Sequence, residues 1–244
     1  MYQTTISIAG LTIAIEHHFK SFQHFAKAFT VTEKDCDFLI SVSEEDIEKE
    51  RVFVEKQSQK EGRPIGYLSG AMLEETAIYR KIADHLIRYQ ALVFHGSAVA
   101  VGNTAVVFSA ISGTGKTTHT RLWLKNVPGS YVVNGDKPIL RVIDGKVFVC
   151  GTPWNGKEHL GENAMVPLTA ICKIHRSPDN RIEQVDSSAF LPHLLEQTHC
   201  PDTPGAMVSL LPVLKQVVDS TSFYALYCNM EDDAALLAAK TLLP

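Results

Sequence analysis

Ser112-Gly113-Thr114-Gly115-Lys116-Thr117-Thr118 is the stretch around which the rest of the chain is organised. Small residues let the backbone N–H groups of such a loop turn inward around phosphate oxygens. Lys116 would add a positive charge at the β- and γ-phosphates, and the hydroxyl of Thr117 is of the kind that coordinates Mg²⁺. The stretch therefore predicts a phosphate-binding loop, with residues 112–118 as the contacts to a nucleotide.

The sequence on either side of the loop supports this interpretation. Thr104–Ala110 is a short apolar run typical of a buried strand, and residues 117–125 favour a helix with Leu122 and Trp123 on its apolar face. A strand, a glycine loop and a helix in this order place the positive end of the helix at the phosphates. We prefer this to the alternative of an ordinary glycine-rich turn. The full phosphate-loop pattern has a glycine five positions before Gly115, where this chain has Ala110. Because alanine tolerates a positive φ poorly, we expect the first turn of the loop to be built differently.

Length and composition limit the class of protein. The 244 residues suffice for one large domain, or for one domain and a smaller one, and the net charge of −4 without a block of Lys or Arg argues against nucleic-acid binding. Five scattered cysteines without Cys-x-x-Cys spacing favour reduced thiols. Residues 89–115 carry no formal charge, yet His95, Gly96 and Gly102-Asn103 interrupt them too often for a membrane helix. No secretory leader is seen, so we expect a cytoplasmic protein without a membrane partner.

Residues 1–90 are predicted to form a small α+β region. Short strands are expected on both sides of Gly10, with further strands and one helix after them: Thr4–Ala9, Leu11–Glu16, Asp37–Val42 and Arg51–Glu55 as strands, and Ala71–Arg88 as a helix. The acidic run 44–50 is interpreted as a solvated loop or helix face. No group of side chains here suggests chemistry, so packing, partner docking or dimerisation, and with it a homo-oligomer, is the default expectation.

Residues 91–244 are predicted to form a mixed, largely antiparallel α/β domain. Gly102-Asn103 and Asp144-Gly145 are turn signals for two hairpins, and the second strand of the first hairpin runs into the phosphate loop. Doubly wound nucleotide folds instead feed this loop by parallel strands. The remaining expected elements are strands at Thr169–His175 and Ser222–Cys228, and helices at Ser187–His199, Gly205–Asp219 and Glu231–Leu243.

Asp136 is the carboxylate that a phosphoryl-transfer site needs opposite the loop. It ends the β-prone run Ser130–Asp136, twenty residues after Lys116, a spacing that lets the helix after the loop cross back and set this strand beside the first. Asp136 can then hold Mg²⁺ or accept the proton of a substrate hydroxyl. The alternative is a turn aspartate in Asn-Gly-Asp-Lys-Pro, and we prefer the functional interpretation.

Further polar residues are weaker candidates. His95 precedes the first hairpin and is either a base at the phosphates or a structural hydrogen-bonding residue. The turn-rich loop 151–159 contains three candidate substrate or metal contacts, Lys157, Glu158 and His159. The alternative interpretation is a mobile surface loop that is anchored by Trp154. His175-Arg176 is either a source of positive charge near a phosphate or a solvated strand end.

Together these residues resemble a known family. His95-Gly96, the hairpin into Ser112–Thr117, and Asn134-Gly135-Asp136-Lys137 resemble the catalytic domain of the HPr kinase/phosphorylase family, which is related to the ATP-dependent phosphoenolpyruvate carboxykinase core. The resemblance covers about residues 92–240. It is closest to the HPr-kinase-like proteins of bacterial peptide-modification clusters, including lasso-peptide kinases.

The resemblance implies ATP, or another nucleoside triphosphate, and Mg²⁺ as cofactors. It implies Lys116 as a phosphate contact, Thr117 and Asp136 as the metal residues, and Asp136 and His95 as catalytic residues. HPr kinases have an Asp-Asp pair where this chain has Gly135-Asp136, so one carboxylate is absent. Two hypotheses follow: a kinase that phosphorylates a hydroxyl, on Ser or Thr of a peptide or protein rather than on a small molecule, and a nucleotide-binding regulatory protein that has lost efficient transfer.

Overall fold

A computed structural model describes the chain except for residues 34, 61, 63, 112, 202–203 and 244. The chain forms two compact units, Met1–His85 and Leu86–Pro244. The sequence had placed this boundary between residues 90 and 91. Among the described residues, none of the helices combines the length and the apolar character that crossing a membrane requires.

The first unit has a three-stranded sheet and helices. Its elements are β1 (Tyr2–Ile8), β2 (Leu11–His17), α1 (Ser21–Phe25), η1 (Lys27–Phe29), β3 (Phe38–Ser41), α2 (Glu44–Lys60) and α3 (Gly70–Leu86). β2 lies between antiparallel β1 and parallel β3. The fully buried carboxylate of Glu74 in α3 accepts hydrogen bonds from the backbone N–H groups of His18 (2.5 Å) and Phe19 (3.0 Å), and so joins the helix to the end of β2.

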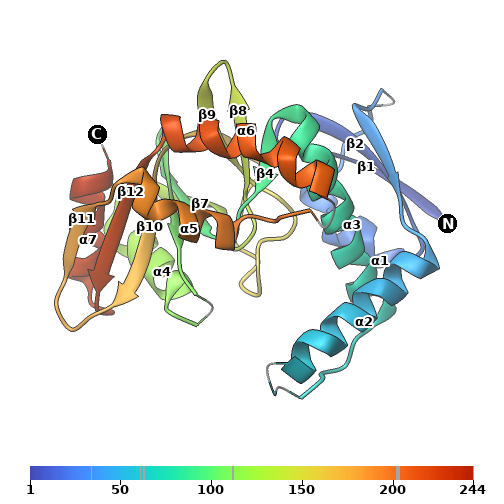
Figure 1. The fold of residues 1–244 in the computed structure, drawn as a ribbon, viewed down its shortest axis with the longest axis horizontal. Helices are drawn as coiled ribbons and strands as arrows, with labels where there is room; N and C mark the ends of the chain where they lie inside the picture. The colour runs from blue at the N-terminus through green and yellow to red at the C-terminus, as the bar shows by residue number, and fades with distance from the viewer. Residues whose placement is uncertain (34, 61, 63, 112, 202–203, 244) are drawn as a thin grey trace. The chain divides into compact units, whose positions relative to one another are not determined.

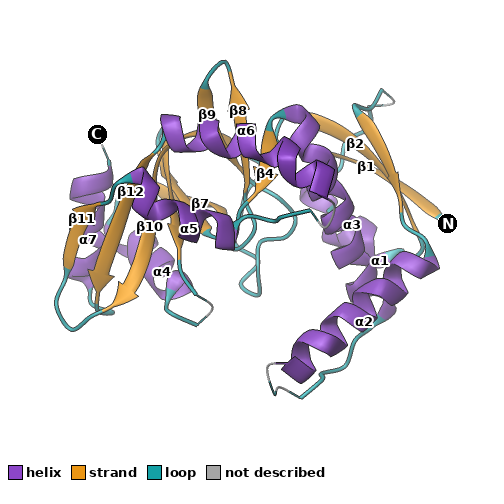
Figure 2. Ribbon diagram, viewed as in Figure 1, coloured by secondary structure: helices purple, strands orange, loops and turns teal. Residues whose placement is uncertain are grey.

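The prediction of a strand at Arg51–Glu55 is wrong, because these residues lie inside α2 (Figure 2). Consecutive β-branched and aromatic residues locally favour a strand. A contact distant in sequence favours the helix instead: Arg80 of α3 forms an ion pair with the buried carboxylate of Glu50, with Nε and Oε1 2.7 Å apart, and its guanidinium lies 4.3 Å from the ring centre of Phe53. The acidic run 44–50 forms the first turns of α2, where negative charge is favourable.

The second unit is built on a mixed sheet of nine strands within the described residues (Figure 1). Its strands are β4 (Ala91–Val93), β5 (Ser97–Val101), β6 (Thr104–Ser109), β7 (Ser130–Asn134), β8 (Ile139–Ile143), β9 (Lys146–Cys150), β10 (Met165–Arg176), β11 (Arg181–Gln184) and β12 (Ser222–Cys228). The main path is β4-β8-β9-β10-β6-β5-β7, and β12 pairs with both β10 and β11. Only the pairs of β10 with β6 and with β12 are parallel within this sheet, among the residues described.

This topology confirms the predicted mixed α/β architecture and both predicted hairpins, β5–β6 and β8–β9. One detail differs from the expectation. The strand after the loop, β7, does not lie beside β6, because β5 lies between them and pairs antiparallel with both. β5, the first strand of the hairpin, therefore occupies the edge of β6 at which the sequence had led us to expect β7.

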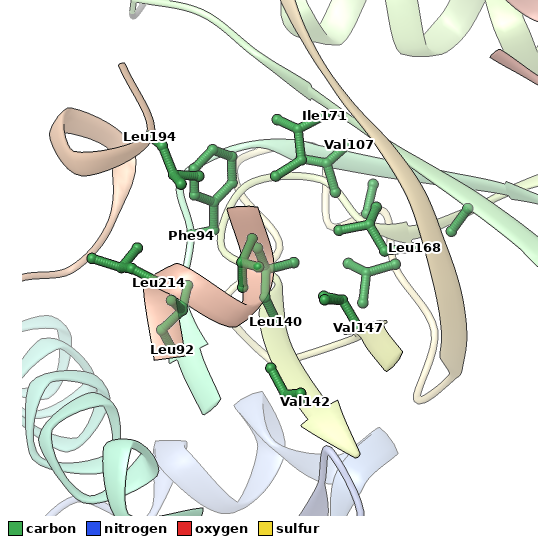
Figure 3. Close-up of a cluster of buried hydrophobic side chains, with 14 of the residues drawn as sticks. Leu92, Phe94, Val107, Leu140, Val142, Val147, Leu168, Ile171, Leu194 and Leu214 are labelled. Carbon is green, nitrogen blue, oxygen red and sulfur yellow. The ribbon is translucent and has the colours of Figure 1, made fainter. Parts of the chain in front are cut away.

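Helices cover both faces of this sheet. They are α4 (Lys116–Asn126), α5 (Ser187–Gln197), α6 (Pro204–Ser220) and α7 (Asp232–Leu242), with the short η2 (Ile87–Tyr89) before β4. Side chains of α5 and α6 pack in one core, where Figure 3 shows Leu194 beside Phe94, and those of α4 and α7 pack in the other. In β6, Val107 faces the first core, whereas Val106 and Phe108 face the second. Because both faces are covered, the strand that leads to the loop is apolar from Ala105 to Phe108.

Candidate functional site

The predicted phosphate loop connects β6 to α4. Gly113 and Gly115 have φ angles of 81° and 129°, in the left-handed region that favours glycine, and α4 begins at Lys116. Ser112 lies outside the described residues. Ala110 does not have a positive φ, so that position does not require the glycine of the full pattern.

Lys116 lies over this loop. Its Nζ atom donates a hydrogen bond to the carbonyl oxygen of Ala110 at 3.0 Å. Burial lowers the pKa of the Lys116 ammonium group, and the negative charge of Asp136 opposes this shift. The ammonium group is thus partly desolvated and near a carboxylate, which strengthens its attraction to anionic groups that enter the loop.

Arg176, at the end of β10, holds the loop from another strand. Its Nε atom donates to the carbonyl oxygen of Thr114 at 2.9 Å, and a terminal nitrogen donates to that of Gly113 at 2.5 Å. These two bonds hold the carbonyl groups of the loop, while the N–H group of Thr114 donates to the carbonyl oxygen of Ile111 at 3.1 Å. The sequence analysis interpreted Arg176 either as positive charge near a phosphate or as part of a solvated strand end. It did not predict the hydrogen bonds of Arg176 to the loop, because they join residues more than sixty positions apart.

Asp136 follows β7 and lies between two basic side chains. Its Oδ1 atom is 3.3 Å from Nε2 of His95, and its Oδ2 atom is 3.1 Å from Nζ of Lys137. Burial by itself would raise the pKa of the Asp136 carboxyl. The hydrogen bond from His95 and the charge of Lys137 outweigh burial and lower the pKa to about 2. Asp136 is therefore ionised at neutral pH.

Asn134 fixes the backbone around this carboxylate. Its Oδ1 atom accepts hydrogen bonds from the backbone N–H groups of Asp136 (2.9 Å) and Lys137 (2.7 Å), and its Nδ2 group donates to the hydroxyl of Thr152 at 2.9 Å. Asn134 is fully buried. The bonds of Asn134 to the backbone could be expected from the sequence, since asparagine often accepts hydrogen bonds from the backbone N–H groups that follow it. Its bond to Thr152, in the loop after β9, could not be predicted.

The loop after β9 packs against the residues around Asp136. The N–H group of Gly135 donates to the carbonyl oxygen of Leu160 at 3.0 Å, and that of Lys137 donates to the carbonyl oxygen of Trp154 at 3.2 Å. A Cβ atom on Gly135 would lie 2.6 Å from the carbonyl oxygen of Asn155. Backbone thus occupies the space that a side chain at position 135 would need.

Gly135→Asp is therefore expected to destabilise the protein. The new side chain has to displace the backbone at Asn155, and such overpacking typically costs about 1–3 kcal/mol. Gly205→Asp is the matched control, because a Cβ atom there meets nothing within 4 Å. Chemical denaturation of both variants checks this, and a Gly135→Asp protein as stable as wild type would show that the loop is not held as described.

One cavity of about 480 Å³ collects most of the predicted site residues. Its lining includes His95, Gly113, Gly115, Lys116, Thr117, Thr118, Asp136, Lys157 and Glu158. Of the predicted residues that the structure describes, two are not in it: Thr114 lines a different cavity, and His159 is exposed at a turn with a φ angle of 50°. The cavity places the loop lysine and the carboxylate of Asp136 in one space.

Helix α4 also contacts the loop after β9. Arg121 of α4 forms an ion pair with Glu158, and both side chains are largely exposed. Deeper in the cavity, the hydroxyl groups of Ser97 and Thr120 are hydrogen bonded at 2.8 Å. Lys157 and Glu158 therefore lie at the exposed edge of the cavity, whereas His95 and Asp136 lie further in.

The residues present fit a Mg²⁺ ion that is bound together with a nucleotide. Thr117 supplies a hydroxyl and Asp136 an ionised carboxylate to the same cavity. Within the described part of the chain, no group of three or more His, Cys, Asp or Glu side chains could hold a metal ion. Mg²⁺ in phosphate sites usually takes only one or two protein ligands and completes its shell with phosphates and water.

The pKa of Asp136 predicts a pH dependence of stability. Its folded value of about 2 is below the ordinary 3.8, so the ionised group stabilises the folded state above about pH 4 and loses this effect as the pH falls towards 2. The difference in unfolding free energy between wild type and Asp136→Asn should therefore be constant at pH of about 5 to 7 and shrink between about 4 and 2. Urea unfolding across this range measures it, and a constant difference would contradict the assigned pKa.

Comparisons with known proteins give only a distant structural likeness. No protein-family model matches the chain, and no curated protein matches it in sequence. Among solved structures, the HPr(Ser) kinase/phosphatase from Coxiella burnetii matches with 11% sequence identity and a TM-score of 0.28, over 50% of this chain and 86% of that one.

Proposed function

We propose that the protein is a kinase that transfers the γ-phosphoryl group of a nucleoside triphosphate to a hydroxyl group, on Ser or Thr of a peptide or protein. The observation that carries the proposal is the single cavity shared by Lys116, Asp136 and His95 at the start of α4. Phosphoryl transfer needs a phosphate cradle, a carboxylate opposite it and a group that orients the nucleophile, and these residues are of the required kinds.

In this proposal, the loop binds the phosphates and Asp136 orients the acceptor. The hydroxyl oxygen forms a bond to the γ-phosphorus, the bond from that phosphorus to the β–γ bridging oxygen breaks, and the nucleoside diphosphate leaves with the electron pair. The hydroxyl proton passes to the Asp136 carboxylate, which His95 and Lys137 hold in place. Thr117 and Asp136 would hold Mg²⁺, whose charge, when bound, offsets that of the phosphates.

The edge of the cavity supports a polypeptide acceptor. Lys157 and the ion pair of Glu158 with Arg121 of α4 are exposed there and present charges of both signs to a chain that lies across the cavity. We therefore propose Lys157 and Glu158 as contacts to the acceptor.

The test is transfer of label from γ-labelled ATP with Mg²⁺ to the proteins of a cell extract and to a library of peptides that contain Ser and Thr. A labelled product that survives acid and is lost in alkali supports a phosphate ester of Ser or Thr. Acid-labile label would indicate another acceptor. No label at all, in a protein that binds MgATP, would favour the nucleotide-binding regulatory role.

A further inference from the structure

Helix α5 holds both polar groups of the His95 backbone. The N–H group of His95 donates to the carbonyl oxygen of Gln197, the last residue of α5, at 2.7 Å. The carbonyl oxygen of His95 accepts a hydrogen bond from the hydroxyl of Ser109 at 3.2 Å. The Nε2 atom of His193, also in α5, lies 3.1 Å from the same hydroxyl oxygen. A hydrogen-bonded chain thus runs from His193 through Ser109 to the backbone of His95.

The direction of these hydrogen bonds follows from the groups involved. A carbonyl oxygen only accepts, so the Ser109 hydroxyl donates to His95, and its oxygen accepts from the Nε2–H group of His193. Burial and the charge of Lys173 lower the pKa of His193 to about 4, so the ring is neutral at pH 7 and carries one proton. The carboxylate of Glu196 lies 3.5 Å from Nδ1, which is too far for a strong hydrogen bond. The Ser109 bond therefore places the proton on Nε2.

The side chains of Ser109 and His193 are shielded from solvent. Ser109 is fully buried, and His193 is 5% exposed. The ring of His193 packs edge-to-face against Phe190 of the same helix, with the ring centres 5.3 Å apart. Neither Ser109 nor His193 lines the cavity of the candidate site. These two residues can therefore affect the reaction only through the residue that they hold, His95.

The backbone around His95 is also bonded to the segment that carries Asp136. The N–H group of Phe94 donates to the carbonyl oxygen of Pro138, and that of Gly96 donates to the carbonyl oxygen of Asp136, both at 3.0 Å. From this backbone, the imidazole of His95 reaches Asp136, with Nε2 and Oδ1 3.3 Å apart. A rotation of the peptide group between His95 and Gly96 would move the ring relative to this carboxylate.

We propose that His193 is a positioning residue for phosphoryl transfer, which holds the imidazole of His95 against Asp136 by way of Ser109. The inference rests on the proposed function and adds to it a residue outside the cavity on which the rate depends. Without the N–H group of His193, the hydroxyl of Ser109 loses its donor and is free to turn away from His95. A displacement of a catalytic group by about 1 Å can cost about a hundredfold in rate.

The experiment uses the full chain and MgATP, whose γ-phosphoryl group is transferred to water in place of an acceptor hydroxyl. We expect His193→Leu to lower the kcat of this hydrolysis by about tenfold to a hundredfold and to leave KM within about threefold, since His193 does not contact the cavity. His193→Gln should keep most of the activity, because its amide can donate an N–H group to Ser109. In His95→Ala protein, His193→Leu should cause no further loss, since no imidazole remains to be positioned.

The environment of the His95 ring is measured independently of activity by NMR of protein with isotope-labelled histidine. His95→Ala identifies the Nε2 resonance of His95 by its disappearance. His193→Leu should move this resonance towards its position in Asp136→Asn, where the charged partner is absent, and His193→Gln should leave it in place. Ser109→Ala breaks the same chain by a smaller change and replaces His193→Leu if that protein does not fold.

His17→Leu is the matched control, because His17 is a buried histidine of the first unit whose Nε2 atom lies 2.8 Å from the hydroxyl of Thr4. It should lower stability without changing kcat. The inference fails alone if His193→Leu leaves the His95 resonance in place, if it lowers kcat equally with and without the His95 imidazole, or if His17→Leu lowers kcat as much. If wild type neither hydrolyses MgATP nor labels any acceptor, the proposed function fails, and the NMR comparison alone decides whether His193 positions His95.

Discussion

Lys116→Ala should weaken the binding of MgATP by about tenfold to a hundredfold or more. The Nζ atom of Lys116 is partly desolvated above the loop, and a hydrogen bond to a charged group in such a place is worth about 1.5–3 kcal/mol. Without a ligand, this ammonium group donates to the carbonyl oxygen of Ala110 at 3.0 Å, so the variant also loses one internal contact. Isothermal calorimetry with MgATP measures the loss.

Lys125→Ala is the control for this prediction. Lys125 lies on the same helix, α4, but is largely exposed and forms an ion pair with Asp232. Its removal changes the net charge by the same amount and should leave nucleotide binding unchanged. Equal affinity of wild type and Lys116→Ala, with unchanged thermal unfolding, would remove the loop from the phosphate site. Equal losses in both variants would mean that only the overall charge matters.

The local parts of the fold could be predicted from the sequence because short-range chemistry determines them. Positive φ angles mark both hairpin turns: Gly102 has a φ of 57° in the first, and Asp144 and Gly145 have φ angles of 49° and 73° in the second. The strand Ser222–Cys228 is observed with the bounds expected. These features depend on residues within a few positions of one another.

Parts that depend on distant contacts could not be predicted. The short strands Ala91–Val93 and Arg181–Gln184 were missed, because the residues of each pair with partners forty or more positions away. In the site, no sequence pattern indicated that loop 152–161 packs against Gly135, which brings Glu158 to the cavity and leaves His159 outside it. Contacts between loops depend on the whole fold, and hydrophobic periodicity does not encode them.

Asp136→Asn should separate nucleotide binding from transfer. A nucleotide is held mainly by the loop N–H groups and Lys116, so we expect the variant to bind MgATP within a few-fold of wild type. Transfer differs, because the acceptor hydroxyl must be aligned with the γ-phosphorus and its proton accepted. Asparagine nearly matches aspartate in shape but carries no charge and accepts no proton. General-base contributions are about 10²–10⁴-fold, so transfer should fall at least about a hundredfold.

Asp144→Asn is the matched control, since Asp144 is an exposed turn residue outside the cavity and asparagine suits the same turn. Transfer and binding should both be preserved in it. If wild type and Asp136→Asn bind nucleotide alike and are equally inert towards every acceptor, the protein is a nucleotide-binding regulator and not a kinase. If Asp136→Asn transfers normally, Asp136 has no part in the chemistry, and His95 or Glu158, which line the same cavity, are the next groups to replace.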